Sequence, residues 1–397
     1  MLKRIAGLFI ARSIPAAGVI VLTLLAPMVL TVDGAAVFLT GVTLLYLLGI
    51  VSRCGLDVYL LKHSASRLRD EVKVIDRTDL MCFLLGLFFS SLFLLGYLLA
   101  ESCFKMAPAY AWVFYALPAF SCQGILASFL KGTGDELYGS LAEPSVSSLL
   151  AVIFFFAFRS LGVVDMEAAY GYAVWFVFLL TLGCVVWARS FAFASDVNFK
   201  KGLIESWVFL LNQLSSYFAQ WYPLFLLGAM DKNLVVYYSV ANRMATIISF
   251  VGVTIDSFAA PRFSNFWKLG DLVSLNIFKR KVAKLALVGA ILCFVCVGVS
   301  AYLYGQIQGF DLTYTAMALT LIASYAAAIG FGPNSFYLMM RDQSNYVTWV
   351  SVCACALVVG ASTALFFLGI SWGMVVIVGG VVLLRSYIFY RKANLVA

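Results

Sequence analysis

The chain has 397 residues, of which 63% are hydrophobic and only 12% charged, and its formal net charge is +8. A mean hydropathy of +0.98 excludes a soluble globular domain, and repeated apolar runs of about 18 residues or more predict a polytopic helical membrane protein. Outer-membrane barrels would show short alternating strands instead. A basic chain can bind nucleic acid, but here the placement of the basic residues explains the charge better, so we expect no nucleic-acid partner.

Twelve apolar segments are long enough to be membrane spans. With the N-terminus on the inner side, only Lys105, Arg159 and Lys232 fall in outer loops, and nearly all other Lys and Arg residues, Arg385 among them, fall on the inner side. This asymmetry follows the positive-inside rule and predicts a multi-pass membrane protein with both termini in the cytoplasm. The predicted spans are 13–32, 36–57, 80–100, 110–130, 141–158, 168–188, 205–228, 234–257, 284–304, 314–336, 346–368 and 370–389.

The spans divide evenly into two halves. Six spans fall in 1–195 and six in 200–397, and these ranges are the predicted N-terminal and C-terminal lobes. A loop acid followed by an apolar span recurs in the two halves, as Asp33 and Asp231. We therefore expect a duplication about an axis along the membrane normal. No hydrophilic segment is long enough to fold alone, so function must lie within the helix bundle.

Arg243 is the most informative residue of the chain. It lies roughly nine residues into the eighth predicted span, which places it ~14 Å deep and close to the middle of a ~30 Å hydrocarbon core. A guanidinium there costs at least ~2.5–3.5 kcal/mol on insertion scales. Such a residue usually faces a wet cavity or a partner, and its positive charge suits an anionic substrate. The alternative is a structural tie to a carbonyl or an acid.

Polar stripes follow the seventh and eighth spans. Gln213 and Gln220 share one helix face, and Ser239 and Asn242 lie on the next helix with Arg243. Stripes on consecutive helices predict a shared hydrated cavity, although hydrogen bonds that simply join the helices would give the same pattern. The candidate substrate-binding residues, including one deep in the fourth span, are Arg243, Asn242, Gln213, Asn212, Gln220, Gln123 and Ser239.

The carboxylates lie away from the middle of the membrane. Asp57 and Glu143 fall at inner helix ends, where Arg53 and Lys131 can balance them. A cation extruder driven by protons or sodium would be expected to place an acid deep in a span. Arg53 and Lys131 are candidates for the first capture of an anionic headgroup, although a purely topological role explains them equally well. We expect His63 to be solvated or to face lipid headgroups.

Motifs for catalysis are missing from the sequence. We find no phosphate-binding glycine loop, no histidine pair at metal spacing and no acidic pair in a loop. We therefore expect no metal site, no cofactor and no enzymatic activity. A membrane-embedded polysaccharide polymerase or glycosyltransferase would generally need a sizeable loop with catalytic residues, and the loops here are short.

The segment Leu224–Leu275 resembles the second-half signature of the polysaccharide-transporter branch of the multidrug/oligosaccharidyl-lipid/polysaccharide (MOP) exporters. The shared pattern has an acid in a short outer loop, a Tyr-containing span with Ala and Arg, and then Pro and Gly-Asp before a basic loop. GLDVYLLKHSAS, at the end of the second span, looks like the matching first-half element. The residues that carry the pattern are Asp231, Tyr237 or Tyr238, Ala241 with Arg243, Pro261 and Gly270-Asp271.

Within that superfamily the chain looks like a Wzx-type O-antigen flippase, which implies a MATE-like fold of twelve helices in two lobes. The implied substrate is an undecaprenyl-pyrophosphate-linked oligosaccharide of lipopolysaccharide or related polysaccharide biosynthesis, moved across the membrane by alternating access. Arg243 would pair with the pyrophosphate, while Asn212, Gln213, Gln220, Asn242 and Gln123 would bind sugar hydroxyls. The implied partners are membrane lipids, a polysaccharide polymerase and a chain-length regulator.

An alternative remains within the transporter class, namely a MATE-like exporter of small amphiphiles. Drug-exporting relatives typically use an acid in the first span, and 13–32 contains none. A carboxylate near the middle of the membrane would favour this alternative, and the sequence places none there.

Overall fold

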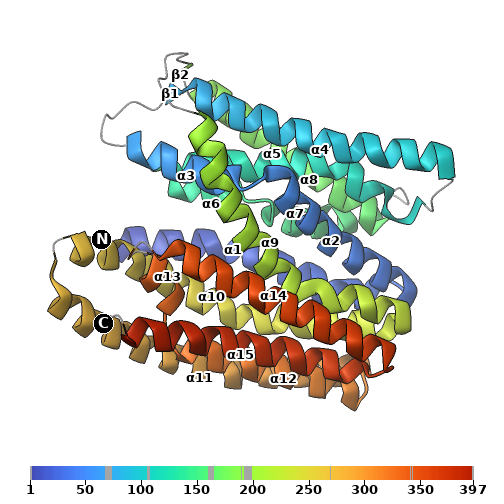
Figure 1. The fold of residues 1–397 in the computed structure, drawn as a ribbon. Coiled ribbons are helices and arrows are strands. Elements are labelled where there is room, and N and C mark those ends of the chain that lie inside the picture. Colours follow the sequence, from blue (N-terminus) through green and yellow to red (C-terminus); the bar gives the residue numbers. More distant parts are fainter. Residues whose placement is uncertain are drawn as a thin grey trace. The chain divides into compact units, whose positions relative to one another are not determined.

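The computed structural model describes residues 2–67, 74–104, 108–159, 165–188, 190–191, 199–268, 270–339, 341 and 343–395. Within these ranges the chain is helical, apart from a parallel pair between β1 (Val74–Ile75) and β2 (Ser190–Phe191). This confirms the predicted all-α fold class, and each of the twelve predicted spans falls on a helix (Figure 1). The inner loop that joins the two predicted lobes, residues 189–201, lies largely outside the described residues.

The chain forms two compact units. The first comprises Met1–Ala26 and Val37–Leu214, and the second comprises Pro27–Ala36 and Ser215–Ala397. The division therefore falls inside the helix α9 (Phe199–Met230). The lobes predicted from the sequence, 1–195 and 200–397, remain a prediction.

The first unit is built around α5 (Ala111–Gly132). This helix is apolar on nearly every side and buries the whole run from Ala116 to Ala127. A helix that is hydrophobic all round takes a central position, and α5 packs against α3, α4, α6 and α8. The other helices of this unit are most of α1 (Leu2–Val29) and α2 (Val32–Arg53), then α3 (Leu56–Arg67), α4 (Arg77–Phe104), α6 (Glu136–Leu141), α7 (Val146–Arg159), α8 (Met166–Ala188) and the first part of α9, with a 3-10 turn at Pro108–Tyr110.

The second unit places α12 (Leu312–Gly330) at the corresponding position, in contact with α10, α11 and α15. Its helix ends follow ordinary capping chemistry. The carboxylate of Asp271 accepts the Ser274 N–H, that of Asp311 accepts the Tyr314 N–H, and Gly309 ends a helix with φ 66°. The other helices of this unit are the second part of α9, α10 (Lys232–Lys268), α11 (Leu272–Gln308), α13 (Asn334–Met339), α14 (Ser344–Phe367) and α15 (Ser371–Leu395).

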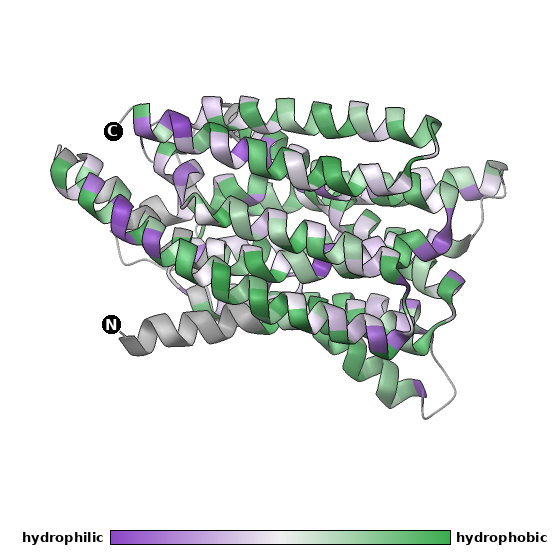
Figure 2. Ribbon diagram, turned by 90° about the horizontal axis from the view of Figure 1, so that it is seen from below, coloured by the Kyte–Doolittle hydropathy of each residue, from purple (hydrophilic) through white to green (hydrophobic). Residues whose placement is uncertain are grey.

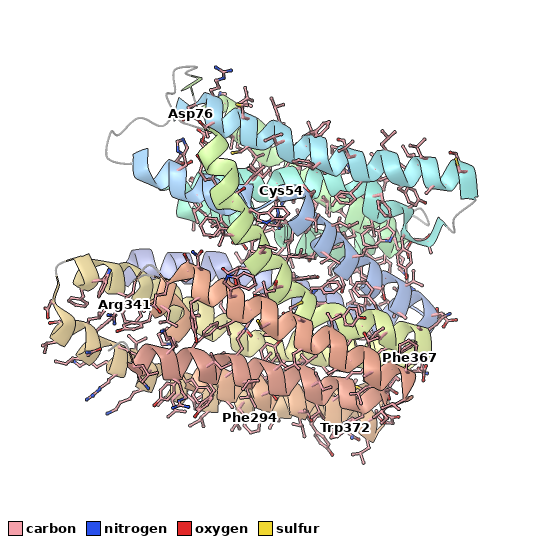
Figure 3. The ribbon with its side chains drawn as sticks, viewed as in Figure 1. Cys54, Asp76, Phe294, Arg341, Phe367 and Trp372 are labelled. Carbon is pink, nitrogen blue, oxygen red and sulfur yellow. The ribbon has the colours of Figure 1, made fainter. Side chains whose placement is uncertain are left out.

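The order of the helices repeats between the units. A six-residue helix follows the central helix in each case, α6 after α5 and α13 after α12, which supports the expected duplication. The clearest difference is a break between α2 and α3, where α10 is continuous. Cys54, labelled in Figure 3, has φ 50° there and Gly55 has φ 72°. Gly55 is required because a Cβ at this position would lie 2.2 Å from the Ser206 carbonyl oxygen.

Eight of the described helices are long and apolar enough to cross a membrane, judged by length and composition alone. Hydrophobic residues run along most helices, and hydrophilic residues gather toward their ends (Figure 2). The helices α9 and α10 do not count among the eight. They carry the polar stripes, and the candidate residues of the second unit lie on them.

Candidate functional site

Arg243 stacks on an aromatic ring inside the second unit. Its Cζ lies 4.3 Å from the centroid of the Trp221 ring, and Trp221 is itself only 2% exposed. The Arg243 side chain on α10 stays partly exposed. A guanidinium that lies on an indole is attracted by the ring quadrupole and still forms hydrogen bonds in its own plane. Trp221 therefore holds a positive charge at a fixed place on the α9–α10 pair.

Gln220 and Asn242 join α9 to α10. Gln220 Nε2 donates to Asn242 Oδ1 at 3.2 Å, and the Tyr238 hydroxyl donates to the Gln220 carbonyl oxygen at 2.5 Å. Asn242 is fully buried. Here the structure favours the helix-joining alternative for this amide pair. Ser239 is 2% exposed, and its hydroxyl has no hydrogen-bond partner within the described part of the chain.

The remaining candidates belong to the first unit. Asn212 and Gln213 lie on the first part of α9, and both are partly exposed. Gln123 is fully buried. Its Nε2 donates to the Glu143 carbonyl oxygen at 3.1 Å, and its Oε1 accepts from the Ser147 hydroxyl at 3.3 Å. These bonds tie α5 to the start of α7. Sugar binding by these three residues stays a prediction.

The first unit brings Arg53 and Lys131 to one pocket of about 230 Å³. Each base has an acid beside it. Arg53 Nε lies 3.6 Å from Asp57 Oδ2, and Lys131 Nζ pairs with Glu143 Oε1. The pocket therefore holds two cations and two carboxylates, so the pairing expected from the sequence is present. An anion that entered would compete with the two carboxylates for the same two cations.

The local fold explains how Arg53 reaches this pocket. Arg53 is the last residue of α2, and its Nε donates to the Gly49 carbonyl oxygen at 2.9 Å. It then passes close to α5, where a Cβ on Gly124 would lie 2.1 Å from Arg53 Nη1. The break after Arg53 sets Asp57 into the first turn of α3. Arg53 thus depends on a helix break and on a glycine of the neighbouring helix.

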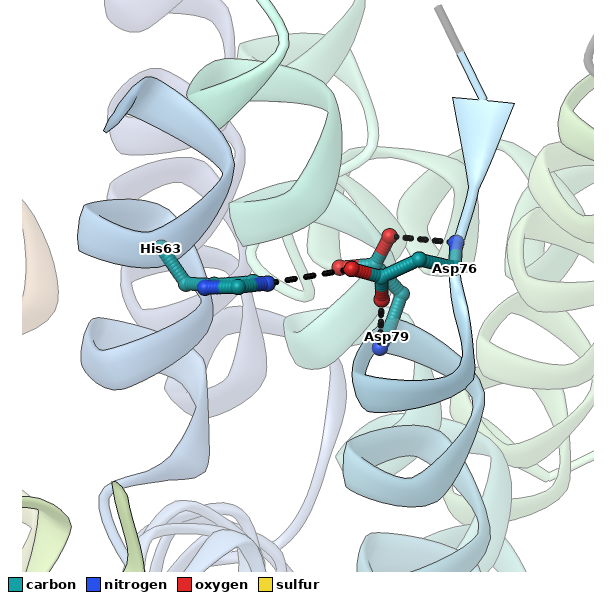
Figure 4. Close-up of side chains that lie close together, drawn as sticks. All are labelled: His63, Asp76 and Asp79. Carbon is teal, nitrogen blue, oxygen red and sulfur yellow. Dashed lines mark hydrogen bonds and ion pairs between the residues drawn. The ribbon is translucent and has the colours of Figure 1, made fainter. Parts of the chain in front are cut away.

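His63 is not solvated, so that expectation was wrong. Its side chain is 10% exposed, and its Nε2 lies 3.2 Å from Asp76 Oδ2. Asp76 and Asp79 accept each other's backbone N–H, at 2.8 and 3.0 Å (Figure 4). This reciprocal pattern is a capping box at the start of α4. The sequence signal was the Asp-x-x-Asp spacing before an apolar run, but the contact with α3 is tertiary and left no trace in the sequence.

The same three side chains are the group of candidate metal ligands among the described residues. Their donor atoms all lie within 4.8 Å of one another. One oxygen of each carboxylate is taken by the capping box, and Asp76 Oδ2 faces the imidazole. A tie between α3 and α4 accounts for this arrangement.

Arg385 is a charged residue of α15 that the charge asymmetry assigns to the inner side, although it falls within the predicted span 370–389. In the structure its Nη1 donates to the Ser216 hydroxyl of α9 at 3.3 Å. A basic residue several positions before the end of a predicted span was the signal that could have revealed it.

Comparisons with known proteins identify the fold. No protein-family model and no curated protein matches the chain. Solved structures do match. An inward-facing MATE family multidrug resistance transporter of the MOP superfamily aligns with a TM-score of 0.70 and 15% identity, over 98% of this chain and 97% of that one. An outward-facing structure of such a transporter aligns with a TM-score of 0.69 and 15% identity, over 99% and 96%.

A third match is a MOP superfamily transporter from Pyrococcus furiosus, whose binding pocket is described as having reverse polarity. It aligns with a TM-score of 0.64 and 13% identity, over 99% of this chain and 95% of that one. Identities this low establish the fold alone. The chain therefore has a MATE-like fold, as the resemblance implied.

Proposed function

We propose that this protein is a flippase that moves an undecaprenyl-pyrophosphate-linked oligosaccharide, the repeat unit of O-antigen or a related polysaccharide, across the bacterial inner membrane. The observation that carries the proposal is Arg243, a guanidinium held on Trp221 in the second unit and partly exposed there. Placing it so deep costs at least ~2.5–3.5 kcal/mol. Pairing with an anionic headgroup offsets that cost, since each partner replaces the solvation that the other has lost.

The charged pocket of the first unit supports the same proposal. Arg53 and Lys131 would receive the pyrophosphate in exchange for Asp57 and Glu143. A diphosphate carries more negative charge and more acceptor oxygens than either carboxylate. Charge-assisted hydrogen bonds of this kind are roughly twice as strong as neutral ones.

The proposed transport cycle is alternating access. Both an inward-facing and an outward-facing structure exist among the MATE transporters that share this fold. We extend such a two-state cycle to this chain, with the polyprenyl tail left in the bilayer. The same proposal places both termini in the cytoplasm and assigns the protein no catalytic activity. A polysaccharide polymerase and a chain-length regulator would then act on the translocated oligosaccharide.

A replacement series at Arg243 tests the function. Arg243→Lys, Arg243→Ala and Arg243→Glu would be expressed in a host that lacks its own copy, with surface glycan and protein level scored together. We expect Ala and Glu to abolish surface glycan at normal protein level and Lys to retain part of it. Arg280→Ala is the matched control, because Arg280 is an exposed arginine of α11. Normal export by all three Arg243 variants would remove the main support for an anionic substrate.

A second candidate is export of small amphiphiles, which the MATE-like fold favours. Uptake and efflux of a cationic dye by cells with and without the protein separates the two functions. Dye efflux that survives in Arg243→Ala, together with unchanged surface glycan, would support the exporter. A glycan defect without any change in dye accumulation would support the flippase.

A further inference from the structure

Arg385 is a second arginine that the second unit keeps inside its helix bundle. It lies on α15 and donates from Nη1 to the Ser216 hydroxyl at 3.3 Å. Tyr325 of α12 lies near it, and that tyrosine is 8% exposed. The neighbours of Arg385 on the opposite side of α15, Leu384 and Tyr387, are 48% and 44% exposed. The guanidinium is thus directed toward α9 and α12.

The depth of Arg385 follows from the direction of its helix. Side chains of an α-helix lean toward its N-terminus, and α15 begins at Ser371, on the proposed outer side. Arg385 therefore leans toward the middle of the membrane instead of extending to the cytoplasmic headgroups. Ser216, to which it donates, lies at the centre of the predicted span 205–228. In the proposed orientation, Arg385 therefore lies within the membrane and not on the positive inner face.

The hydrogen bond to Ser216 uses only one of the N–H groups of the Arg385 guanidinium. A guanidinium has five N–H groups, and its ordinary partner in a protein interior is a carboxylate. No carboxylate pairs with Arg385 within the described residues. The residue as a whole is only partly buried. Ionisable residues at this depth usually mark a substrate path.

We propose that Arg385 forms a second phosphate subsite of the second unit, which contacts the diphosphate headgroup before Arg243 does. This rests on the proposed function and names a further residue that carries it. Arg385 is anchored at Ser216 and Arg243 at Trp221, both on α9. These positions are five residues apart, which corresponds to ~7.5 Å along the helix axis. The two positive charges are therefore anchored at successive depths along α9.

The experiment measures binding of inorganic pyrophosphate to the purified full-length protein by calorimetry, at fixed ionic strength. Arg385→Gln removes the charge and should raise the Kd about 10- to 100-fold, the range for losing charged hydrogen bonds. Arg385→Lys keeps the charge without the bidentate fork and should give an intermediate value. Ser386→Ala, on the next residue of α15, is the matched control and should leave the Kd unchanged.

Ser216→Ala separates a phosphate subsite from a simple helix tie. It removes the hydrogen bond but leaves the guanidinium, so we expect a Kd change of at most about threefold. If Arg385 only ties α15 to α9, then Ser216→Ala and Arg385→Gln should lower the unfolding temperature equally and leave the Kd as it is. That result would overturn the subsite. If Arg385→Gln does not accumulate, Arg385→Lys takes its place. Its Kd and unfolding temperature are then compared with those of Ser216→Ala.

The outcomes also distinguish this subsite from the flippase itself. Loss of pyrophosphate binding in Arg243→Ala but not in Arg385→Gln would refute the second subsite and leave the flippase standing. A wild-type protein that does not bind pyrophosphate would refute the subsite, whereas the flippase would still be decided by the surface glycan of the Arg243 variants.

Discussion

Replacing Gly124 with alanine tests whether the position of Arg53 matters. The new Cβ would lie 2.1 Å from Arg53 Nη1 and 3.0 Å from its Cδ. Ordinary van der Waals contact begins at 3.4 Å, so the guanidinium must retreat by about 1.3 Å. Arg53 is also held by the Gly49 carbonyl oxygen at 2.9 Å and by Asp57 at 3.6 Å. Because Arg53 Nε makes both contacts and belongs to the same planar group, we expect a retreat of this size to weaken them.

The magnitude follows from two opposing terms. A hydrogen bond to a charged group contributes ~1.5–3 kcal/mol, whereas alanine is favoured over glycine in a helix by ~0.8–1.0 kcal/mol. The net loss of stability should be ~0.5–2 kcal/mol. Gly171→Ala in α8 is the matched control, because a Cβ there would meet nothing within 4 Å. It should be neutral or stabilising by up to ~1 kcal/mol.

Thermal unfolding in one detergent measures the stability, and surface glycan measures the function. We expect Gly124→Ala to unfold at a lower temperature than wild type and to export less glycan, and Gly171→Ala to do neither. The reasoning would be refuted if the two alanine variants had equal unfolding temperatures and equal export. In that case Arg53 can move without consequence, and its part in capturing the headgroup would have to be abandoned.

Two further predictions concern helix ends. Gly55→Ala should prevent accumulation of the protein in the membrane, because φ is 72° and the Cβ would lie 2.2 Å from a backbone oxygen that cannot yield; a normal level on an immunoblot would contradict this. The hydrogen bond from the Ser274 side chain, and then that from its backbone N–H, lowers the pKa of Asp271. Its stabilising effect is therefore present above the unfolded pKa of ~3.9 and lost as pH falls through the folded value. Asp271→Ala should unfold at a lower temperature than wild type at pH 7, and the difference should shrink as the pH falls below about 3.9; a difference unchanged by acid would show that the cap does not act through the carboxylate.

The fold could be predicted from the sequence because each span is a local property. An apolar run long enough to cross a bilayer must form a helix, since its backbone groups have no other partner in lipid. The apolar residues around α5 even indicate a buried helix. The break between α2 and α3 could not be predicted in the same way. It depends on how closely Gly55 approaches Ser206, which lies far away in the sequence.

The candidate site could be predicted only in part. Arg243 stands out because one charge in a long apolar run is a strong local signal. The pairing of Arg53 with Asp57 is also local, at a spacing of four residues. By contrast, the contacts of His63 with Asp76 and of Arg385 with Ser216 join different helices, so only the tertiary structure reveals them.

The pairing of β1 with β2 implies an order in which the contacts of the first unit form during synthesis. Val74 pairs with Ser190, and a ribosome that adds ~5–20 residues per second needs roughly 6–23 s to travel from one to the other. The capping box of Asp76 and Asp79 and its contact with His63 are available almost as soon as α4 emerges. This end of the first unit is therefore assembled in two stages, and a nascent chain arrested before α8 would hold the first contact without the second.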